Sequence, residues 1–450
     1  MNYELASTIC APATASGGAL GIIRVSGPKA FSAVSSVCSV DCSTVAPHSL
    51  HHTHIKAPVP ADSPAGQEII DEVLVSVFRA PHSYTGEDAV EISCHGSRYI
   101  INKILELLCQ QGCRMALPGE FTQRAYLNGK MDLSQAEAVA DLIASTNKAT
   151  HDIALSQLRG HFSSELSTLR GQLLKLTSLL ELELDFSDHE DLEFADRTEL
   201  IHLAQLIENH IQRLADSFQM GNALKQGIPV AIVGAPNVGK STLLNTLLGE
   251  ERAIVSDIQG TTRDAIEDTI ELGGITFRFI DTAGIRHTAD TIEQLGIERS
   301  IAAAQRARII LMMTEPGVPY PDLTIRDDQT VIYIENKTEI FQAKFGIGID
   351  ELKQRLIAAV PTFAGTDFIV TNARHYDALV RAHDSILRVI EGMGGQKVDG
   401  QWVMVNESLP GDLLAEDLRQ TLDVLAEITG GQITPQETLN NIFSHFCVGK

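Results

Sequence analysis

The sequence lacks any long hydrophobic run. Although the chain has 450 residues, nowhere do about 18 apolar residues follow one another, which is roughly the minimum for a helix that crosses a membrane. The N-terminus also lacks a basic segment followed by an apolar one, so no secretory signal is expected. We therefore predict a protein without membrane-spanning helices.

Basic residues are scarce. The chain has 35 Lys and Arg against 58 Asp and Glu, which gives a formal net charge of -23 at pH 7. Such a surface repels phosphate backbones and anionic membranes. Any contact with nucleic acid would have to be a local patch or belong to a partner.

Paired-cysteine motifs are absent. The 7 cysteines are odd in number and include no Cys-x-x-Cys, so a disulfide framework is not expected. This usage favours reduced thiols and a cytoplasmic protein. Four histidines, His48, His51, His52 and His54, lack acidic partners at ligand spacing, and a solvated loop is predicted there in preference to a metal site.

The chain is too long for one ordinary domain, and at about 100–200 residues each it predicts two to four of them. Strand-like segments broken by glycine indicate a mixed α/β region first. Helical periodicity then appears in Asp132–Asn147, Leu155–Leu184 and Glu199–Phe218, and returns in Tyr376–Glu391 and Asp412–Ile428. We predict an α/β domain (1–118), a helical domain in two segments (119–224 and 366–450) and an inserted α/β domain (225–365).

The inserted domain opens with a phosphate-binding motif. The apolar strand Ile228–Val233 runs into Gly234–Ser241, which reads GAPNVGKS and matches GxxxxGK[ST]. The glycines allow backbone N–H groups to surround a phosphate, and the helix Thr242–Leu248 points its positive end at it. Lys240 would reach the β- and γ-phosphate oxygens, and Ser241 would bind Mg²⁺.

Two switch motifs follow in the order that a GTP-hydrolysing switch protein requires. In Gly260–Asp264, a threonine hydroxyl and a backbone N–H can meet Mg²⁺ and the γ-phosphate. The strand Ile275–Ile280 then leads to Asp281-Thr282-Ala283-Gly284, where Asp281 can hold the water shell of the metal and Gly284 can meet the γ-phosphate.

The base-reading motif departs from the usual Asn-Lys-x-Asp. The strand Val331–Ile334 leads to Asn336-Lys337-Thr338-Glu339, and Gln342 stands where a serine is usual. Glu339 is one methylene longer than aspartate but can present the same two oxygens if the loop shifts. Guanine is the predicted base, and a nucleotide-promiscuous P-loop switch remains an alternative.

The group that orients the attacking water is not in its usual place. Ile285 follows Asp-Thr-Ala-Gly, where small GTPases have a glutamine. Glu293 is the candidate replacement, acting directly or through a second water. A solvated charge at the start of the helix Ile297–Ala307 is the alternative. Arg263, Arg286, a partner residue or a bound cation could meet the transition-state charge.

Five further motifs are spread along the chain: Gly21–Gly27 (GIIRVSG), Tyr84–Asp88 (YTGED), Pro118–Ala125 (PGEFTQRA), Asp132–Ala138 (DLSQAEA) and Phe446–Lys450 (FCVGK). With the phosphate loop, they resemble the tRNA modification GTPase family MnmE, also called TrmE, from end to end. The resemblance implies a multidomain α/β and α fold, with an N-terminal α/β folate-binding and dimerisation domain, a discontinuous helical domain and an inserted P-loop GTPase (Ras-like) α/β domain.

The resemblance also implies a function. The family's members are cytoplasmic homodimers and K⁺-activated GTPases. With the FAD-containing partner MnmG (GidA), in a heterotetramer or larger assembly, they place a (carboxymethyl)aminomethyl group on carbon 5 of the wobble uridine of tRNA. A tetrahydrofolate derivative supplies the one-carbon unit. A GTP-regulated ribosome assembly factor is the alternative that the G domain alone leaves open.

Site residues carry over position by position. Arg24, Glu91, Lys130 and Lys450 match the folate pocket; Asn237, Ser256, Ile258 and Thr261 match the K⁺ site; Ser241 and Thr262 hold Mg²⁺. Glu293 matches the catalytic acid, acting beside Lys240. The expected nucleotide contacts are Asn237, Val238, Gly239, Lys240, Ser241, Thr242, Ser256, Asp257, Ile258, Gln259, Gly260, Thr261, Thr262, Asp281, Thr282, Ala283, Gly284, Asn336, Lys337 and Glu339.

Cys447 has two interpretations. In the family, this cysteine lies near the folate site and matters for tRNA modification, so a catalytic role is one of them. A packed structural thiol is the other. The ending Cys-Val-Gly-Lys is a poor prenylation signal.

Overall fold

The computed structural model describes residues 6–15, 17–57, 68–185, 197–250, 268–280, 302–360, 369–398, 401–404, 409, 411–431, 436–444 and 446–449. The chain divides into two compact units: Met1–Ala140, Gln157–Ser163 and Ala426–Lys450 form one, and Asp141–Ser156 with Ser164–Leu425 form the other. None of the helices in the described part of the chain combines the length and apolar character needed to cross a bilayer.

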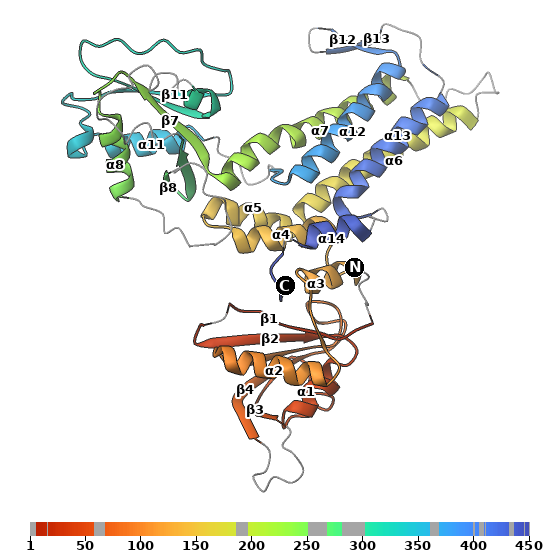
Figure 1. Ribbon diagram of the computed structural model, residues 1–450. Coiled ribbons are helices and arrows are strands. Elements are labelled where there is room, and N and C mark those ends of the chain that lie inside the picture. The colour runs from red at the N-terminus through yellow and green to blue at the C-terminus, as the bar shows by residue number, and fades with distance from the viewer. Residues whose placement is uncertain are drawn as a thin grey trace. The chain divides into compact units, whose positions relative to one another are not determined.

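A six-stranded sheet forms the core of the first unit, in the order β3-β4-β5-β2-β1-β6. Helices α1 and α2 lie against one of its faces (Figure 1), and their apolar residues join the inward residues of the strands in one buried cluster. Exposed and buried residues alternate along β4, as expected for a sheet with one covered face. The elements are β1 (Ile9–Pro12), β2 (Leu20–Ser26), α1 (Ala30–Val37), β3 (Ser49–Ala57), β4 (Glu68–Phe78), β5 (Ala89–His95), α2 (Arg98–Gln110) and β6 (Arg114–Met115).

The C-terminal segment packs into the same unit. Phe443 of α14 (Gln436–Ser444) and Phe446, which follows it, join Leu133 of α4 (Leu133–Ala144) in a buried cluster. The backbone of α14 also lies close to Gly119, the residue before α3 (Glu120–Leu127). A Cβ at position 119 would lie 2.6 Å from the carbonyl oxygen of Phe443. Motifs far apart in the sequence therefore meet here.

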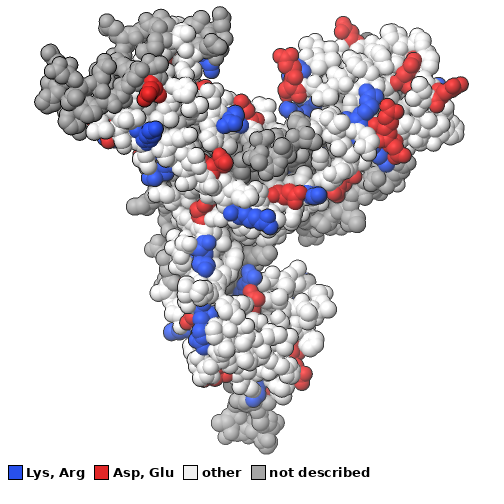
Figure 2. Space-filling model, turned by 180° about the vertical axis from the view of Figure 1, so that it is seen from behind, with Lys and Arg blue, Asp and Glu red and all other residues white. Residues whose placement is uncertain are grey.

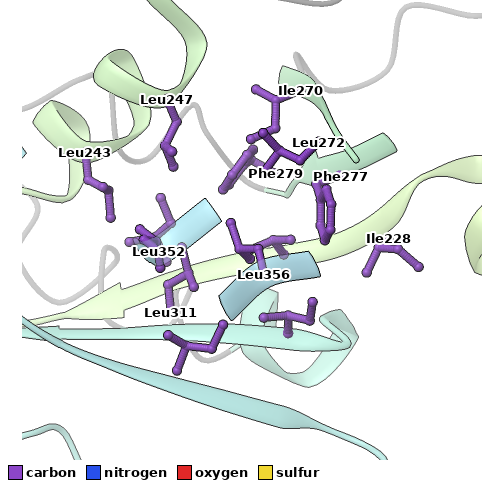
Figure 3. Close-up of a cluster of buried hydrophobic side chains, with 14 of the residues drawn as sticks. Ile228, Leu243, Leu247, Ile270, Leu272, Phe277, Phe279, Leu311, Leu352 and Leu356 are labelled. Carbon is purple, nitrogen blue, oxygen red and sulfur yellow. The ribbon is translucent and has the colours of Figure 1, made fainter. Parts of the chain in front are cut away.

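The second unit contains a five-stranded sheet in the order β11-β10-β7-β9-β8, in which only the β8–β9 pair is antiparallel among the described strands. Apolar residues from the strands meet leucines of α8 and α11 in one core (Figure 3). The central strands β7 and β10 are buried on both faces, which is typical of a parallel sheet between helices. The elements are β7 (Ile228–Gly234), α8 (Lys240–Glu250), β8 (Asp268–Leu272), β9 (Ile275–Phe279), β10 (Ile309–Thr314), β11 (Thr330–Glu335), η1 (Ala343–Phe345) and α11 (Ile349–Ala358).

Long helices complete the second unit. Helices α7 and α12 pack side by side (Figure 1), with the rings of Phe218 and Tyr376 stacked at 4.4 Å between centroids. The predicted helical segments are confirmed, with two differences. The helix in Asp132–Asn147 ends at Ala144. Leu155–Leu184 contains a break, because Gly160 adopts a φ of 82° between α5 and α6. The elements are α5 (Lys148–Leu158), α6 (His161–Asp185), α7 (Arg197–Gln226), α12 (Ala373–Gly392), β12 (Gly395–Val398), β13 (Gln401–Met404) and α13 (Gly411–Thr429).

The prediction of a loop at the histidine cluster is wrong. His51, His52 and His54 lie in β3, the edge strand of the first sheet. His54 and His52 approach Glu72 of β4 at 3.3 and 3.8 Å. Polar residues are compatible with an edge strand because one face and one edge are open to water. No cluster of metal ligands is found among the described residues.

Candidate functional site

The phosphate loop follows the central strand β7 and ends where α8 begins at Lys240. Asn237 and Gly239 have φ angles of 65° and 98°, and a left-handed backbone of this kind is typical of loops whose N–H groups surround an anion. The Lys240 ammonium donates to the carbonyl oxygens of Gly234 and Ala235, both at 2.8 Å. Burial lowers the pKa of Lys240 below its ordinary value. The loop therefore combines backbone donors with a partly desolvated cation.

Asn336 connects this loop to the base-reading segment. Its Nδ2 donates to the carbonyl oxygen of Val238 at 2.7 Å, and its Oδ1 accepts from the N–H of Ala343 at 3.0 Å. A Cβ on Gly239 would lie 2.4 Å from that Nδ2, so only glycine fits the contact. The Asn336 side chain is buried, and its two bonds fix three segments relative to one another.

Lys337 and Glu339 lie on the outer side of the same segment. Lys337, at a φ of 63°, donates to the carbonyl oxygen of Asn237 at 3.2 Å and pairs with Glu315. Thr338 and Phe341 close a turn through bonds of 3.0 and 3.1 Å. That turn leaves Glu339 exposed.

The remaining predicted nucleotide and catalytic residues lie outside the described residues. These are Ser256, Asp257, Ile258, Gln259, Gly260, Thr261, Thr262, Asp281, Thr282, Ala283, Gly284 and Glu293, together with the alternatives Arg263 and Arg286; Lys450 lies outside them too. In the sequence, residues 256–262 precede β8, and residues 281–293 follow β9.

The first unit contains a cavity of about 140 Å³. Arg24 and Glu91 line it, and their side chains pair at 2.7 Å. Tyr84 adds an aromatic ring 5.6 Å from the Arg24 guanidinium carbon, and Phe121 adds another apolar wall. The Lys130 ammonium instead donates to the carbonyl oxygen of Pro81 at 2.9 Å. The cavity thus offers aromatic surface next to a cation and an anion.

A buried ionic network supports the wall of this cavity. The hydroxyl of Ser26 donates to Glu87 at 2.7 Å and shares a bond of 2.7 Å with Thr85. Glu87 in turn accepts two bonds of 3.1 Å from Arg124, a side chain that is 1% exposed. Sequence reasoning missed this network, although Glu87 and Arg124 both lie in motifs that carried the family resemblance.

Glu120 completes the network. It accepts from Arg124 at 3.0 Å and from Arg114 at 2.5 and 2.8 Å. Burial alone would raise the pKa of Glu120, but hydrogen bonds from Arg114, the Leu117 N–H and Arg124 outweigh it, and the pKa lies below its ordinary value. The carboxylate is therefore held ionised in the interior.

The C-terminal tail reaches the cavity through its backbone. The carbonyl oxygen of Gly449 accepts from Arg24 at 3.3 Å. A Cβ on Gly449 would lie 2.1 Å from the carbonyl oxygen of Pro12, so the tail lies tightly against β1. The Cys447 carbonyl oxygen accepts from the Gly119 N–H at 3.4 Å, and the Cys447 residue is exposed. A packed structural thiol is therefore the wrong interpretation of Cys447.

Basic side chains do not dominate the face shown in Figure 2. Over its described residues, Lys and Arg are interspersed with Asp and Glu, in keeping with the net charge of -23. That arrangement gives little attraction for an extended phosphate backbone on this face.

Two family models match the chain. The model described as "GTP-binding protein TrmE N-terminus" matches residues 8–130, and the "MnmE helical domain" model matches residues 133–447.

Similar proteins span the chain from end to end. Proteins named tRNA modification GTPase MnmE from Bacteroides fragilis, Phocaeicola vulgatus and Parabacteroides distasonis are 51%, 51% and 50% identical to it. The alignments cover 98%, 98% and 99% of this chain and 99%, 99% and 100% of the relatives. A crystal structure of a variant of Aquifex aeolicus Era bound to GDP and AlF4⁻ matches 45% of this chain and 89% of that chain, with 22% identity and a TM-score of 0.21. That score is too low to add to the fold assignment.

Proposed function

The chain belongs to the MnmE family of tRNA modification GTPases, and from that premise we propose that it is a K⁺-activated GTPase that acts with an FAD-containing partner of the MnmG type. The pair would place a (carboxymethyl)aminomethyl group on carbon 5 of the wobble uridine of tRNA, with a tetrahydrofolate derivative as one-carbon donor. GTP hydrolysis in tRNA modification is the activity that the family assigns.

The observation that carries the nucleotide part is the clamp from Asn336 to Val238 and Ala343. It holds a phosphate loop and a base-reading loop in one rigid site, as a guanine nucleotide requires. We propose that Lys240 and the loop N–H groups bind the β- and γ-phosphates, and that Asn336, Lys337 and Glu339 read the base.

We propose the residues that bind the metal ions and orient water from their positions in the sequence motifs. Ser241, in the first turn of α8, and Thr262 would hold Mg²⁺, which stabilises negative charge on the phosphates when bound. Asn237 lies at an exposed position of the phosphate loop and would hold K⁺ with Ser256, Ile258 and Thr261. Glu293 would orient the attacking water, and Asp281 and Gly284 would face the metal and the γ-phosphate.

We propose that the cavity in the first unit binds a tetrahydrofolate derivative. Its aromatic residues, Tyr84 and Phe121, suit a flat pterin ring, and Glu91 can accept hydrogen bonds from a pterin N–H edge. Lys130 and Lys450 would pair with the carboxylates of the glutamate tail, and Arg24 would hold Glu91 in place through their ion pair. We propose that Cys447, exposed on the tail beside this cavity, acts in the modification chemistry.

The assembly is proposed from the same premise. A homodimer would form through the N-terminal domain (1–118), with the G domain (225–365) inserted between the two segments of the helical domain (119–224 and 366–450). The acidic charge of the chain favours a division of labour in which the MnmG-type partner makes most of the contacts to tRNA phosphates.

Binding of 5-formyltetrahydrofolate, measured by isothermal titration, tests the folate proposal. We expect binding by the native chain and loss of at least about tenfold in affinity for Arg24→Ala, which removes a charge-assisted contact. Lys103→Ala, at an exposed ion pair on α2, is the matched control and should bind normally. No binding by the native chain would favour the assembly-factor alternative.

Modified wobble uridine, detected by nucleoside mass spectrometry after incubation with partner, tRNA, GTP and the folate, tests the whole reaction.

A further inference from the structure

Two cysteines of the first unit, Cys38 and Cys42, form a pair of interacting thiols. Cys38 caps the C-terminus of α1 in extended conformation, and its Sγ donates to the carbonyl oxygen of Val40 at 3.3 Å. The chain then folds back, and the Cys42 N–H donates to the Ser35 hydroxyl at 2.9 Å. Cys42 lies within the buried cluster of the first sheet, and Cys38 packs against the same cluster.

The two thiols differ in access and in acidity. Cys38 is half-buried, whereas Cys42 is fully buried. The hydrogen bond from Cys42 lowers the pKa of Cys38 to about 7, and the same pairing raises the pKa of Cys42. An accessible thiolate next to a protected thiol is the arrangement that redox-sensing cysteines use.

We propose that Cys38 and Cys42 form a reversible disulfide when the protein meets a peroxide. The Cys38 thiolate attacks the peroxide, a sulfur–oxygen bond forms as the oxygen–oxygen bond breaks, and the departing oxygen takes a proton. The Cys42 sulfur then attacks the Cys38 sulfur, and hydroxide leaves with the Cys42 proton as water. Sulfur is oxidised and the peroxide is reduced, and a dithiol reductant reverses the change.

The other cysteines of this unit provide contrasts. Cys10 and Cys113 also interact, but they are 0% and 6% exposed, so a peroxide does not reach them in the folded domain. Cys94 is 1% exposed, and burial raises its pKa to about 11. The Cys38–Cys42 pair is therefore expected to oxidise before Cys10, Cys113 and Cys94.

Arg79 connects the backbone after Cys42 to a strand that lines the cavity. The Arg79 guanidinium, directly after Phe78 of the cavity wall, donates to the carbonyl oxygens of Cys42, Ser43 and Val45 at 3.4, 2.7 and 3.0 Å. A disulfide that pulls the 38–42 segment would act on these bonds. The proposal itself concerns disulfide formation and does not depend on what the cavity binds.

Mass spectrometry of the full chain after brief treatment with hydrogen peroxide tests the proposal. Trypsin releases residues 30–56 as one peptide that holds Cys38 and Cys42 as its cysteines. We expect this peptide to lose two hydrogen atoms, to resist alkylation after unfolding, and to regain both thiols with dithiothreitol. Cys94→Ser should behave like the native chain, and Cys38→Ser should leave Cys42 open to alkylation. The proposal is overturned if both thiols stay reduced while Cys447 oxidises, or if Cys38 stops at irreversible sulfinic acid.

Discussion

Asn336 bonds to Val238 on one side and to Ala343 on the other, at 2.7 and 3.0 Å, and so fixes the phosphate loop to the base-reading loop. Asn336→Ala should weaken GTP binding by about 10- to 100-fold, because buried partners lose their bonds at about 1–3 kcal/mol. Fluorescent GTP-analogue titration measures it. Asn209→Ala, on the exposed face of α7, is the control, and equal affinities for both variants would contradict the clamp.

Glu339 should carry guanine selectivity despite its extra methylene. Its carboxylate is exposed and free to reach the base edge, so Glu339→Ala should lower GTP affinity by about tenfold or more, the value of a charge-assisted bond. ATP affinity should not change, because adenine offers no matching donors. Glu339→Asp should bind GTP at least as tightly as the native chain. Competition of ATP against labelled GTP measures selectivity, and equal competition would establish a promiscuous switch.

Arg124 should be a major source of stability in the first unit. Arg124→Ala leaves the carboxylates of Glu87 and Glu120 without their buried partner, a loss of about 3–5 kcal/mol. Hydrogen exchange of β2 and β5 amides measures it in the intact chain. Lys103→Ala removes an exposed pair and should cost less than about 1 kcal/mol. Similar exchange in the two variants would show that the network contributes little.

Cys38 should react as a thiolate near neutral pH. Its pKa of about 7 reflects first the Cys42 hydrogen bond, then the opposing effect of burial, with Lys56 lowering it and Asp41 raising it. Because the thiolate is the reactive form, the alkylation rate should rise about tenfold from pH 6 to pH 8 and then level off. The alkylation rate of a thiol with an ordinary pKa would rise about 100-fold between pH 6 and pH 8, without a plateau. Quenched iodoacetamide labelling of residues 30–56 distinguishes the two.

The phosphate loop could be predicted because its geometry is local. The glycine-containing turn and the helix that begins at Lys240 are indicated by residues next to one another in the sequence. The amphipathic helices could be predicted for the same reason, although the break at Gly160 was hidden because both helices continue a similar periodicity. The contact between Gly239 and Asn336 is not local, and only the folded chain shows it.

The ionic network and the edge strand could not be predicted. Arg124, Glu87 and Ser26 come from three separate segments, and only the folded chain shows that Arg124 and Ser26 both donate to the Glu87 carboxylate. The histidines of β3 resemble a solvated loop in sequence because an edge strand with one open face tolerates polar residues. These histidines form a strand because β3 pairs with β4, from which residues 58–67 separate it in the sequence.

The most direct test of the proposed K⁺-activated hydrolysis is the steady-state GTPase rate of the purified chain in KCl and in NaCl at equal ionic strength, beside Glu293→Ala. We predict a fast rate in KCl alone, which Glu293→Ala abolishes, because a monovalent cation at the phosphates replaces an arginine finger and the glutamate orients water. Equal rates in the two salts, with the variant as active as the native chain, would contradict the account and indicate a switch with other catalytic groups.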